Sequence, residues 1–227
     1  MSAPSTGDEE ALLLEGVEIR LAGRPLIVGL DLSVPPGVVV TLMGPSGTGK
    51  SSLLDFLCGT LDPAFEARGR VRLGGQDLLA LPPERRGLGM LFQDDLLFPH
   101  LSVGENLAFG IPPELRGRRR RLARAAEALA EAGLAGFEDR DPATLSGGQR
   151  ARVALFRTLL AAPRALLLDE PFGRLDVALR DRVRRFVFDH ARARRLPTLL
   201  VTHDPADAAA AAGPLVQLST SGMQQSG

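Results

Sequence analysis

The chain has 227 residues, a formal net charge of zero and 44% hydrophobic residues, which is the composition of an ordinary globular protein. This balance gives no overall field that would attract nucleic acid, so no nucleic-acid partner is expected, and no apolar run reaches the roughly 18–20 residues of a membrane-spanning helix. The single cysteine, Cys58, excludes an intrachain disulfide, fits a reducing compartment and is expected to be a small buried residue.

The first elements in chain order are a polar terminus and a group of strands. Residues 1–10 lack the basic-then-apolar order of a signal peptide and are expected to be disordered. Residues 12–21 and 26–34 have the composition of strands separated by the turn Ala22-Gly23-Arg24-Pro25, and residues 69–75 predict a further strand and turn. Together they predict a small antiparallel β lobe.

A glycine-rich loop follows the next predicted strand, the apolar run 38–43. Its sequence, Gly44-Pro45-Ser46-Gly47-Thr48-Gly49-Lys50-Ser51, matches the G-x-x-x-x-G-K-[ST] phosphate-binding pattern and leads into a predicted helix. Lys50 is the only lysine of the chain, since every other basic residue is arginine. A lysine reaches β- and γ-phosphates as a compact point charge, the loop N–H groups bind phosphate, and the Ser51 hydroxyl can ligate Mg²⁺.

The remaining pattern alternates helices and strands. Residues 112–134 predict a helix, whose basic run 116–121 is expected to be a solvated face rather than a nucleic-acid or lipid contact. Residues 165–168 and 198–201 predict short buried strands, with the helical stretch 177–195 between them. This order favours a mostly parallel sheet flanked by helices.

Two carboxylates end the strand Leu166-Leu167-Leu168-Asp169-Glu170. Alone, this pair is explained as an N-cap ahead of Pro171. Beside a phosphate loop it indicates catalysis, because the carboxyl ends of strands carry the ligand site of an open α/β sheet. Asp169 is then a Mg²⁺ ligand, largely through water, and Glu170 orients or deprotonates the attacking water.

Leu145-Ser146-Gly147-Gly148-Gln149 predicts a second anion-binding helix N-terminus, ahead of the helix 150–160. One nucleotide does not need two such cradles from one chain. We therefore expect this segment to close over the nucleotide bound to a second copy of the chain.

These motifs, in this order, resemble the ATP-binding subunit of ABC transporters over about residues 12–215. The resemblance implies an α/β fold: a P-loop NTPase core with a mostly parallel sheet flanked by helices, a small antiparallel β lobe and an inserted α-helical subdomain. It implies one domain over 11–218, with the helical subdomain at about 95–160 and a disordered tail at 219–227. The implied cofactors are ATP and Mg²⁺.

The resemblance also assigns roles to residues of this sequence. It implies Glu170, the switch histidine His203 and the Q-loop glutamine Gln93 as catalytic residues. The implied Mg²⁺ ligands are Ser51, Gln93 and Asp169. The implied ATP-binding residues are Gly44, Pro45, Ser46, Gly47, Thr48, Gly49, Lys50, Ser51, Ser52, Ser146, Gly147, Gly148, Gln149 and Asp176.

The chain is also similar to the Ynj-type ATPases, near those of thiamine, iron and polyamine importers, and the stretch 141–180 carries most of this likeness. The segment 97–107 resembles the start of the helical subdomain of bacterial binding-protein-dependent importers. This implies that membrane permease subunits contact the region Gln93–Leu107 and that a periplasmic or extracellular binding protein takes part indirectly. It further implies a dimer with a second copy, at the cytoplasmic face of the inner or plasma membrane.

Some alternatives and departures stay open at this point. An ABC exporter ATPase, or a soluble ABC-type ATPase not coupled to transport, shares these motifs, and the Ser-Gly-Gly-Gln element disfavours a P-loop kinase or GTPase. Leu21 stands where the family usually stacks an aromatic residue on adenine, so base selectivity is expected to be weak. Gly173 replaces a frequent serine, Arg150-Ala151-Arg152 replaces the more usual Gln-Gln-Arg, and neither change touches a phosphate ligand.

Overall fold

The computed structural model describes residues 10–91, 96–175, 177–219 and 222–225. The chain forms two compact units, each of which is described by itself. The first unit comprises residues 1–90, 164–170 and 185–227, and the second comprises 91–163 and 171–184. Within the described ranges, no helix combines the length and the apolar character that crossing a bilayer requires.

An antiparallel sheet of four strands opens the first unit, in the order β2-β1-β4-β5. Leu21 pairs with Arg24, so the hairpin closes over Ala22 and Gly23, and its second strand begins two residues before the predicted start at residue 26. The side chains of β1 that face inward are buried, which gives the sheet one apolar face. The strands are β1 (Leu12–Leu21), β2 (Arg24–Val34), β4 (Phe65–Leu73) and β5 (Gln76–Asp77).

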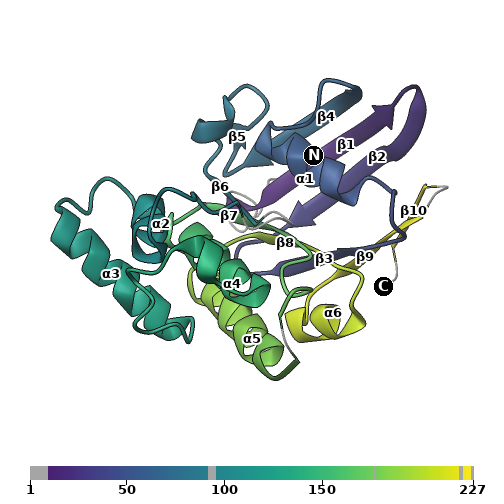
Figure 1. Ribbon diagram of the computed structural model, residues 1–227. Coiled ribbons are helices and arrows are strands. Elements are labelled where there is room, and N and C mark those ends of the chain that lie inside the picture. The colour runs from purple at the N-terminus through teal and green to yellow at the C-terminus, as the bar shows by residue number, and fades with distance from the viewer. Residues whose placement is uncertain (1–9, 92–95, 176, 220–221, 226–227) are drawn as a thin grey trace. The chain divides into compact units, whose positions relative to one another are not determined.

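The second sheet of this unit is mostly parallel, with six strands in the order β10-β9-β3-β8-β7-β6 (Figure 1). Strand β3 pairs in parallel with β8 and with β9, and β7 pairs in parallel with β8. Every residue of β7 and β8 is buried, because a central parallel strand is covered on both faces. The strands are β3 (Val39–Met43), β6 (Leu88–Leu91), β7 (Ala165–Asp169), β8 (Thr198–Val201), β9 (Leu215–Ser219) and β10 (Gly222–Gln225).

Helix α1 (Lys50–Cys58) fills the core of the first unit. Its buried residues Leu53, Leu54 and Leu57 belong to one apolar cluster with side chains of β1, β2, β3, β7 and β8. Burial of each leucine contributes about 1.5–3 kcal/mol, so the helix that follows the phosphate loop is fixed to both sheets. Helix α6 (Pro205–Ala211) completes the described helices of this unit, and α5 (Val177–Ala193) supplies residues to both units.

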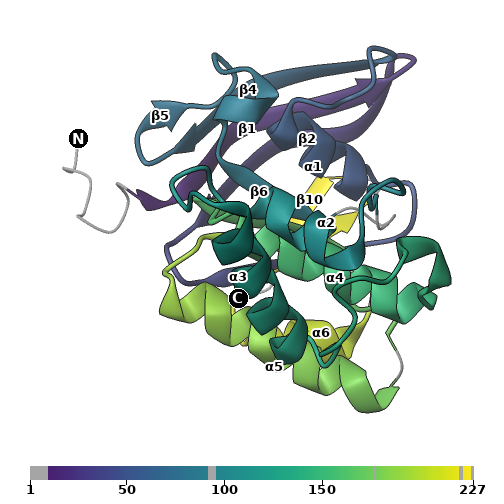
Figure 2. The ribbon, with the colours of Figure 1, turned by 60° about the vertical axis from the view of Figure 1, so that its left-hand side comes forward.

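The second unit is helical (Figure 2). Helices α2 (Val103–Gly110), α3 (Arg118–Glu131) and α4 (Gly147–Leu160) pack against one another. Both α2 and α4 begin with a capping box, in which a serine accepts from the backbone of the third helical residue and that residue's side chain accepts from the serine N–H. Among the described residues, Pro83–Arg85 and Pro142–Thr144 form short 3₁₀ turns.

Four arginines donate hydrogen bonds to backbone carbonyl groups at the C-terminal ends of helices, where the helix itself supplies too few N–H donors. Arg86 donates to Phe56 and Leu57 at the end of α1. The same contact recurs at α2, α3 and α6, where one planar guanidinium reaches two or more carbonyl oxygens. The capping arginines are Arg86 for α1, Arg121 for α2, Arg152 for α3 and Arg192 for α6.

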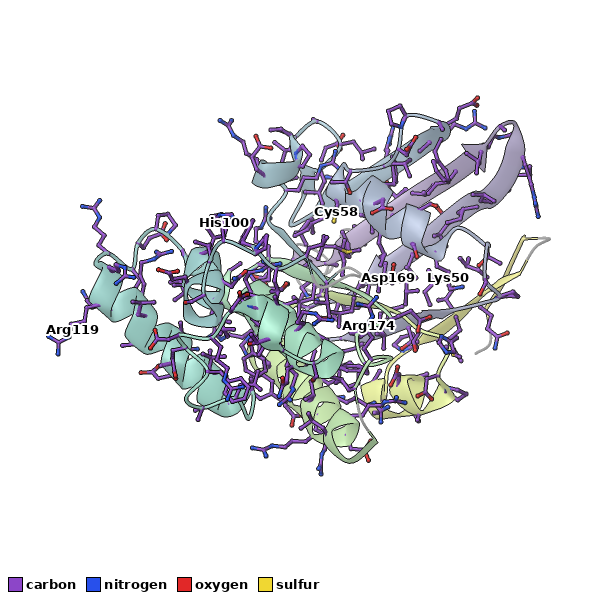
Figure 3. The ribbon with its side chains drawn as sticks, in the orientation of Figure 1. Lys50, Cys58, His100, Arg119, Asp169 and Arg174 are labelled. Carbon is purple, nitrogen blue, oxygen red and sulfur yellow. The ribbon has the colours of Figure 1, made fainter. Side chains whose placement is uncertain are left out.

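The basic run 116–121 therefore differs in part from the predicted solvated face. Arg119 is exposed and projects away from the helix, as Figure 3 shows. Arg121 instead folds inward and donates to the carbonyls of Ala108 and Ile111, at 2.7 and 2.6 Å. The helix also begins later than the predicted residue 112, at Arg118, because Gly117 before it has φ +94°, which is outside the helical region.

The tail differs from its prediction as well. Residues 222–225, expected to be disordered, form β10, which pairs antiparallel to β9. Most of the predicted disordered start of the chain, residues 1–9, lies outside the described residues. The prediction of one domain over 11–218 with a helical subdomain at about 95–160 stays a prediction.

Candidate nucleotide site

The phosphate loop runs from the end of β3 to the first turn of α1. The Lys50 ammonium folds back over the loop and donates to the carbonyls of Gly44 and Pro45, at 2.7 and 2.8 Å. Thr48 Oγ1 donates to the same Pro45 carbonyl, at 2.9 Å. Burial lowers the pKa of Lys50, against the opposing effect of the Glu170 and Asp169 carboxylates. The lysine is thus a partly desolvated cation near two acids.

Two glycines of the loop are required by space and backbone conformation. A Cβ on Gly44 would lie 2.5 Å from the carbonyl oxygen of Leu218 in β9, which leaves no room for a side chain. Gly49, the N-cap of α1, has φ +89°, and a Cβ there would lie 3.0 Å from Leu26 Cβ. These two positions therefore accept only glycine without strain.

The carboxylates lie at the same edge of the parallel sheet as the loop. Asp169 is level with Val201 of β8, and β8 lies between β7 and β3. Asp169 is buried, and the Ser51 hydroxyl lies near its carboxylate. Burial raises the pKa of Asp169 despite the opposing effects of Ser51 and Lys50. Figure 3 shows Lys50 and Asp169 close together at this edge.

Hard oxygen donors of this kind suit Mg²⁺. Ser51 and Asp169 place a hydroxyl and a carboxylate side by side, immediately after the loop that binds phosphate. The second pair of groups at this edge is Glu170 and His203, whose Oε1 and Nδ1 atoms are 2.8 Å apart. Glu170 has φ +50°, a conformation that costs a non-glycine residue about 1 kcal/mol or more, and it turns the carboxylate out of the strand.

The exposure of these two side chains differs. His203 is 78% exposed and Glu170 is 23% exposed. The hydrogen bond with Glu170, followed by the charge of that carboxylate, raises the pKa of His203. The imidazole of His203 is therefore open to solvent and hydrogen-bonded to the mostly buried carboxylate of Glu170. This arrangement can hold or transfer a proton beside a phosphate.

The segment Leu145–Gln149 lies in the second unit and begins α4. The Ser146 hydroxyl accepts from Gln149 N at 3.3 Å, and Gln149 Oε1 accepts from Ser146 N at 2.9 Å. The two glycines between them form the first turn of the helix, whose N–H groups are suited to bind an anion. The predicted residues Gln93 and Asp176 lie outside the described residues.

The structure also identifies residues that the sequence did not. Thr202 and Asp207 are buried and hydrogen-bonded on either side of His203. Leu96, inside the predicted partner region, is 56% exposed. Phe109, two residues beyond the end of that region, is 64% exposed, and the two side chains give it an apolar surface. An acid at the third position of a helix and exposed large apolar side chains are weak signals in a sequence, because both are usually structural.

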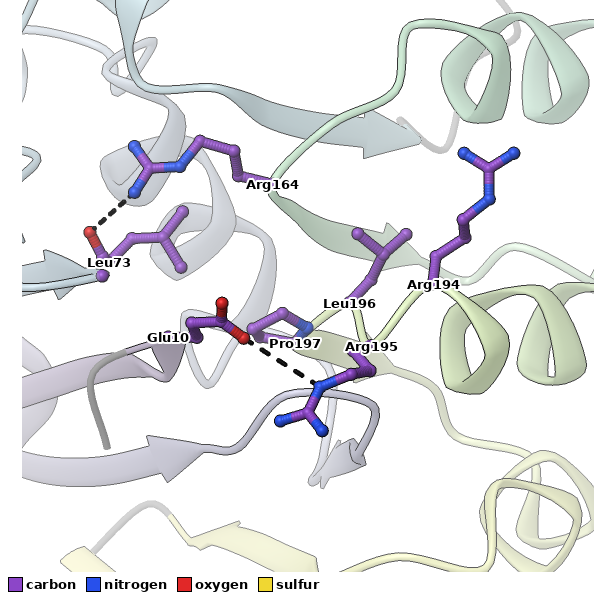
Figure 4. A pocket seen from close by; sticks show the side chains of 8 residues that line it. Glu10, Leu73, Arg164, Arg194, Arg195, Leu196 and Pro197 are labelled. Atoms are coloured by element: carbon purple, nitrogen blue, oxygen red, sulfur yellow. Dashed lines mark hydrogen bonds and ion pairs between the residues drawn. The ribbon is translucent and has the colours of Figure 1, made fainter. Parts of the chain in front are cut away.

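A cavity of about 610 Å³ lies at the opposite edge of the sheet, where β7 and β8 begin. Arg164 donates to Leu73 O at 3.1 Å, and Arg195 pairs with Glu10 at 4.0 Å. Figure 4 shows that the guanidinium groups of Arg164, Arg194 and Arg195 point to different sides of this cavity, so they do not converge on one ligand atom.

Burial raises the pKa of the Cys58 thiol to about 12. The thiol therefore stays protonated near neutral pH, which argues against a nucleophilic role.

A glycine-rich loop with a lysine at the end of a parallel strand, and two carboxylates at the end of a nearby strand, define a P-loop ATPase. The family model described as ABC transporter matches residues 27–173. The chain belongs to this family and is an ATP-binding, ATP-hydrolysing transporter subunit.

Individual proteins agree with this assignment. The chain is 50% identical over 196 residues, 86% of its length and 90% of the relative's, to the uncharacterized ABC transporter ATP-binding protein YnjD of Escherichia coli (strain K12). It is 46% identical to the thiamine import ATP-binding protein ThiQ of Chelativorans sp. (strain BNC1), covering 78% of this chain and 71% of that protein. The dimeric ATP-binding cassette MJ0796, bound to ADP and Pi, is similar in structure, with TM-score 0.80, 28% identity and coverage of 94% and 97% of the two chains.

Proposed function

We propose that the chain energises a solute importer, as a peripheral subunit at the cytoplasmic face of the membrane. The names of several relatives support import, among them the thiamine import protein already described and a ferric-ion import protein from Rhizobium etli, which is 40% identical over 88% of this chain and 56% of its own length. The observation that carries the catalytic part is the Glu170–His203 pair beside Asp169 and the phosphate loop.

Each residue at the edge of the parallel sheet has a proposed task. The loop N–H groups and Lys50 bind the β- and γ-phosphates, and Ser51, Asp169 and Gln93 hold Mg²⁺. Mg²⁺ would neutralise phosphate charge when bound. Glu170 orients the attacking water and accepts its proton, and His203 holds the γ-phosphate.

The second half of the site comes from a second copy of the chain. Ser146, Gly147, Gly148 and Gln149 begin a helix whose N–H groups suit a phosphate, and they close over the partner's nucleotide together with Asp176. The dimeric cassettes among the similar structures support this arrangement. Hydrolysis then controls whether the two copies stay together.

The permease contacts an aromatic patch, defined as Leu96, Phe98, His100 and Phe109. The rings of Phe98 and Phe109 meet edge to face, with centroids 4.7 Å apart, and Phe109 is largely exposed. The fully buried Asn106 accepts from Phe98 N at 2.8 Å and donates to Phe98 O at 3.0 Å, so the patch is rigid at its centre. A rigid aromatic surface is suited to receive an apolar helix of another subunit.

Co-expression with a candidate permease tests the proposal. The purified complex should hydrolyse ATP faster when a substrate-loaded binding protein is added to proteoliposomes. Stimulation by free substrate without a binding protein would contradict import. Phe109→Ser should abolish co-purification with the permease. Val28→Ser, which removes another exposed apolar side chain (54% exposed), is the matched control and should not.

A further inference from the structure

The segment that carries His203 is anchored from both sides. It joins the end of β8 to the start of α6, and the imidazole that it carries is 78% exposed. Thr202, directly before His203, is 0% exposed, and Asp207, four residues after it, is 3% exposed. An exposed functional side chain is therefore held between two buried polar groups, which are hydrogen-bonded to each other at 2.7 Å.

The hydrogen bonds of this anchor form a relay. Asp204 N–H donates to Thr202 Oγ1 at 3.1 Å, and Thr202 Oγ1 donates to Asp207 Oδ2 at 2.7 Å. Asp204 is the N-cap of α6 and Asp207 is its third helical residue. In α2 and α4 the N-cap N–H bonds directly to the side chain of the third residue, whereas here a hydroxyl is inserted between the two.

This insertion ties the strand to the helix across His203. Thr202 N–H also donates to Leu42 O of β3, at 3.3 Å, and Asp204 Oδ1 accepts from Ala206 N at 2.8 Å. The backbone on both sides of His203 is thus fixed to the strand that leads into the phosphate loop. The Thr202 hydroxyl accepts from Asp204 and donates to Asp207 through one oxygen atom, so the relay depends on this side chain.

We propose that Thr202 and Asp207 are positioning residues for His203. They fix its backbone so that the imidazole meets both Glu170 and the γ-phosphate. This inference rests on the proposed function, in which His203 holds that phosphate. Neither residue needs to touch the nucleotide to have this effect.

Steady-state hydrolysis tests the inference with two pairs of variants. Thr202→Val removes the hydroxyl at almost constant volume and should lower kcat roughly tenfold or more, with KM for ATP changed less than about twofold, because misplacement costs the chemical step. Thr202→Ser keeps the hydroxyl and should stay within about twofold of wild type. Asp207→Ala should resemble Thr202→Val, and Asp207→Asn, which retains an acceptor, should be milder.

A double-mutant cycle identifies the residue through which the effect acts. In a His203→Ala background, Thr202→Val should have no further effect on the residual hydrolysis. An equal loss in both backgrounds would overturn the inference. If His203→Ala alone left hydrolysis unchanged, the proposed role of His203 would fail instead, so the two failures are distinguishable.

Lost stability is separated from lost positioning by a control and a second readout. Arg192→Ala removes the cap at the other end of α6, donated to Ala211 O at 3.0 Å, and should lower the unfolding midpoint without changing kcat. The chain has three histidines, so the imidazole signals of His203 can be assigned by NMR. With a non-hydrolysable ATP analogue bound, the His203 imidazole of the wild type should give one set of sharp signals. The same signals should be broadened in Thr202→Val. Equally sharp signals together with an unchanged kcat would contradict the inference.

Discussion

The Nδ1 atom of His203 lies 2.8 Å from Oε1 of Glu170, so the proposed base is hydrogen-bonded to the proposed phosphate ligand. Glu170 directly follows β7 and His203 lies two residues after β8, and the register of these parallel neighbours places Asp169 opposite Val201. The contact is possible because Glu170 has a positive φ and turns out of β7. Proton position and phosphate binding are thereby linked through one hydrogen bond.

The first prediction concerns the pH dependence of this pair. The Glu170 carboxylate raises the pKa of His203 above its ordinary value of 6.5. A raised folded-state pKa contributes stability below the unfolded-state value, and this contribution is lost as pH rises through the folded-state value. NMR titration of nucleotide-free protein should give a lower His203 pKa in Glu170→Gln than in wild type. Equal pKa values would mean that the pair does not form in solution.

The second prediction concerns Lys50. Lys50→Ala removes the cation over the loop and should weaken ATP binding roughly ten- to hundredfold, the loss typical of a charged hydrogen bond. Lys50→Arg should also be impaired, because a planar guanidinium replaces a compact ammonium that reaches the carbonyls of Gly44 and Pro45. Calorimetric titration with ATP measures both variants. Near-normal binding and hydrolysis by Lys50→Ala would exclude its assigned role.

The third prediction concerns the capping arginines. Arg86 is 7% exposed and donates to three carbonyls, those of Leu81, Phe56 and Leu57. Arg86→Ala removes this donor from all three carbonyls, of which that of Phe56 keeps a second donor, Gly59 N–H at 3.2 Å, and should lower the free energy of unfolding by about 3 kcal/mol. The exposed Arg119→Ala is the control and should change it by less than about 0.5 kcal/mol. Urea unfolding measures both, and similar midpoints would refute the capping role.

The fourth prediction concerns the base of the nucleotide. Leu21 is 37% exposed at the end of β1, opposite Phe65 of β4, and offers an aliphatic surface instead of an aromatic ring. ATP and GTP should be hydrolysed at similar rates. Leu21→Tyr should tighten ATP binding about tenfold, since stacking of a base on an aromatic side chain is worth about 1–3 kcal/mol. A strict preference of wild type for ATP would count against this assignment.

Much of the fold was predictable because local patterns determine it. The apolar run before the phosphate loop and the run before Asp169 correspond to β3 and β7, and β1 has the predicted bounds 12–21. Helices α2 and α6 were not predicted, because they are short and their starts depend on capping contacts. The C-terminal strands β9 and β10 were missed because polar residues interrupt their apolar pattern.

The candidate site was predictable as a set of residues, but not as a set of contacts. The motifs identify Lys50, Asp169, Glu170 and His203 individually. The bond between Glu170 and His203 depends on a positive φ, and the Thr202–Asp207 relay depends on which side of α6 faces the strand. The role of the arginines as helix caps likewise cannot be predicted without the packing of the helices, because a basic run in a sequence indicates only a solvated surface.

The most direct measurement is the oligomeric state of Glu170→Gln with ATP and Mg²⁺. We expect this variant to bind ATP, to hydrolyse it very slowly and to accumulate as a dimer, since Ser146–Gln149 of each copy closes over the other copy's nucleotide. Size-exclusion chromatography coupled to light scattering should show a dimer with ATP and a monomer without it. Ser146→Ala in the same background is the control, and less dimer is expected. A Glu170→Gln protein that stays monomeric with saturating ATP, while wild type turns over normally, would contradict the shared site.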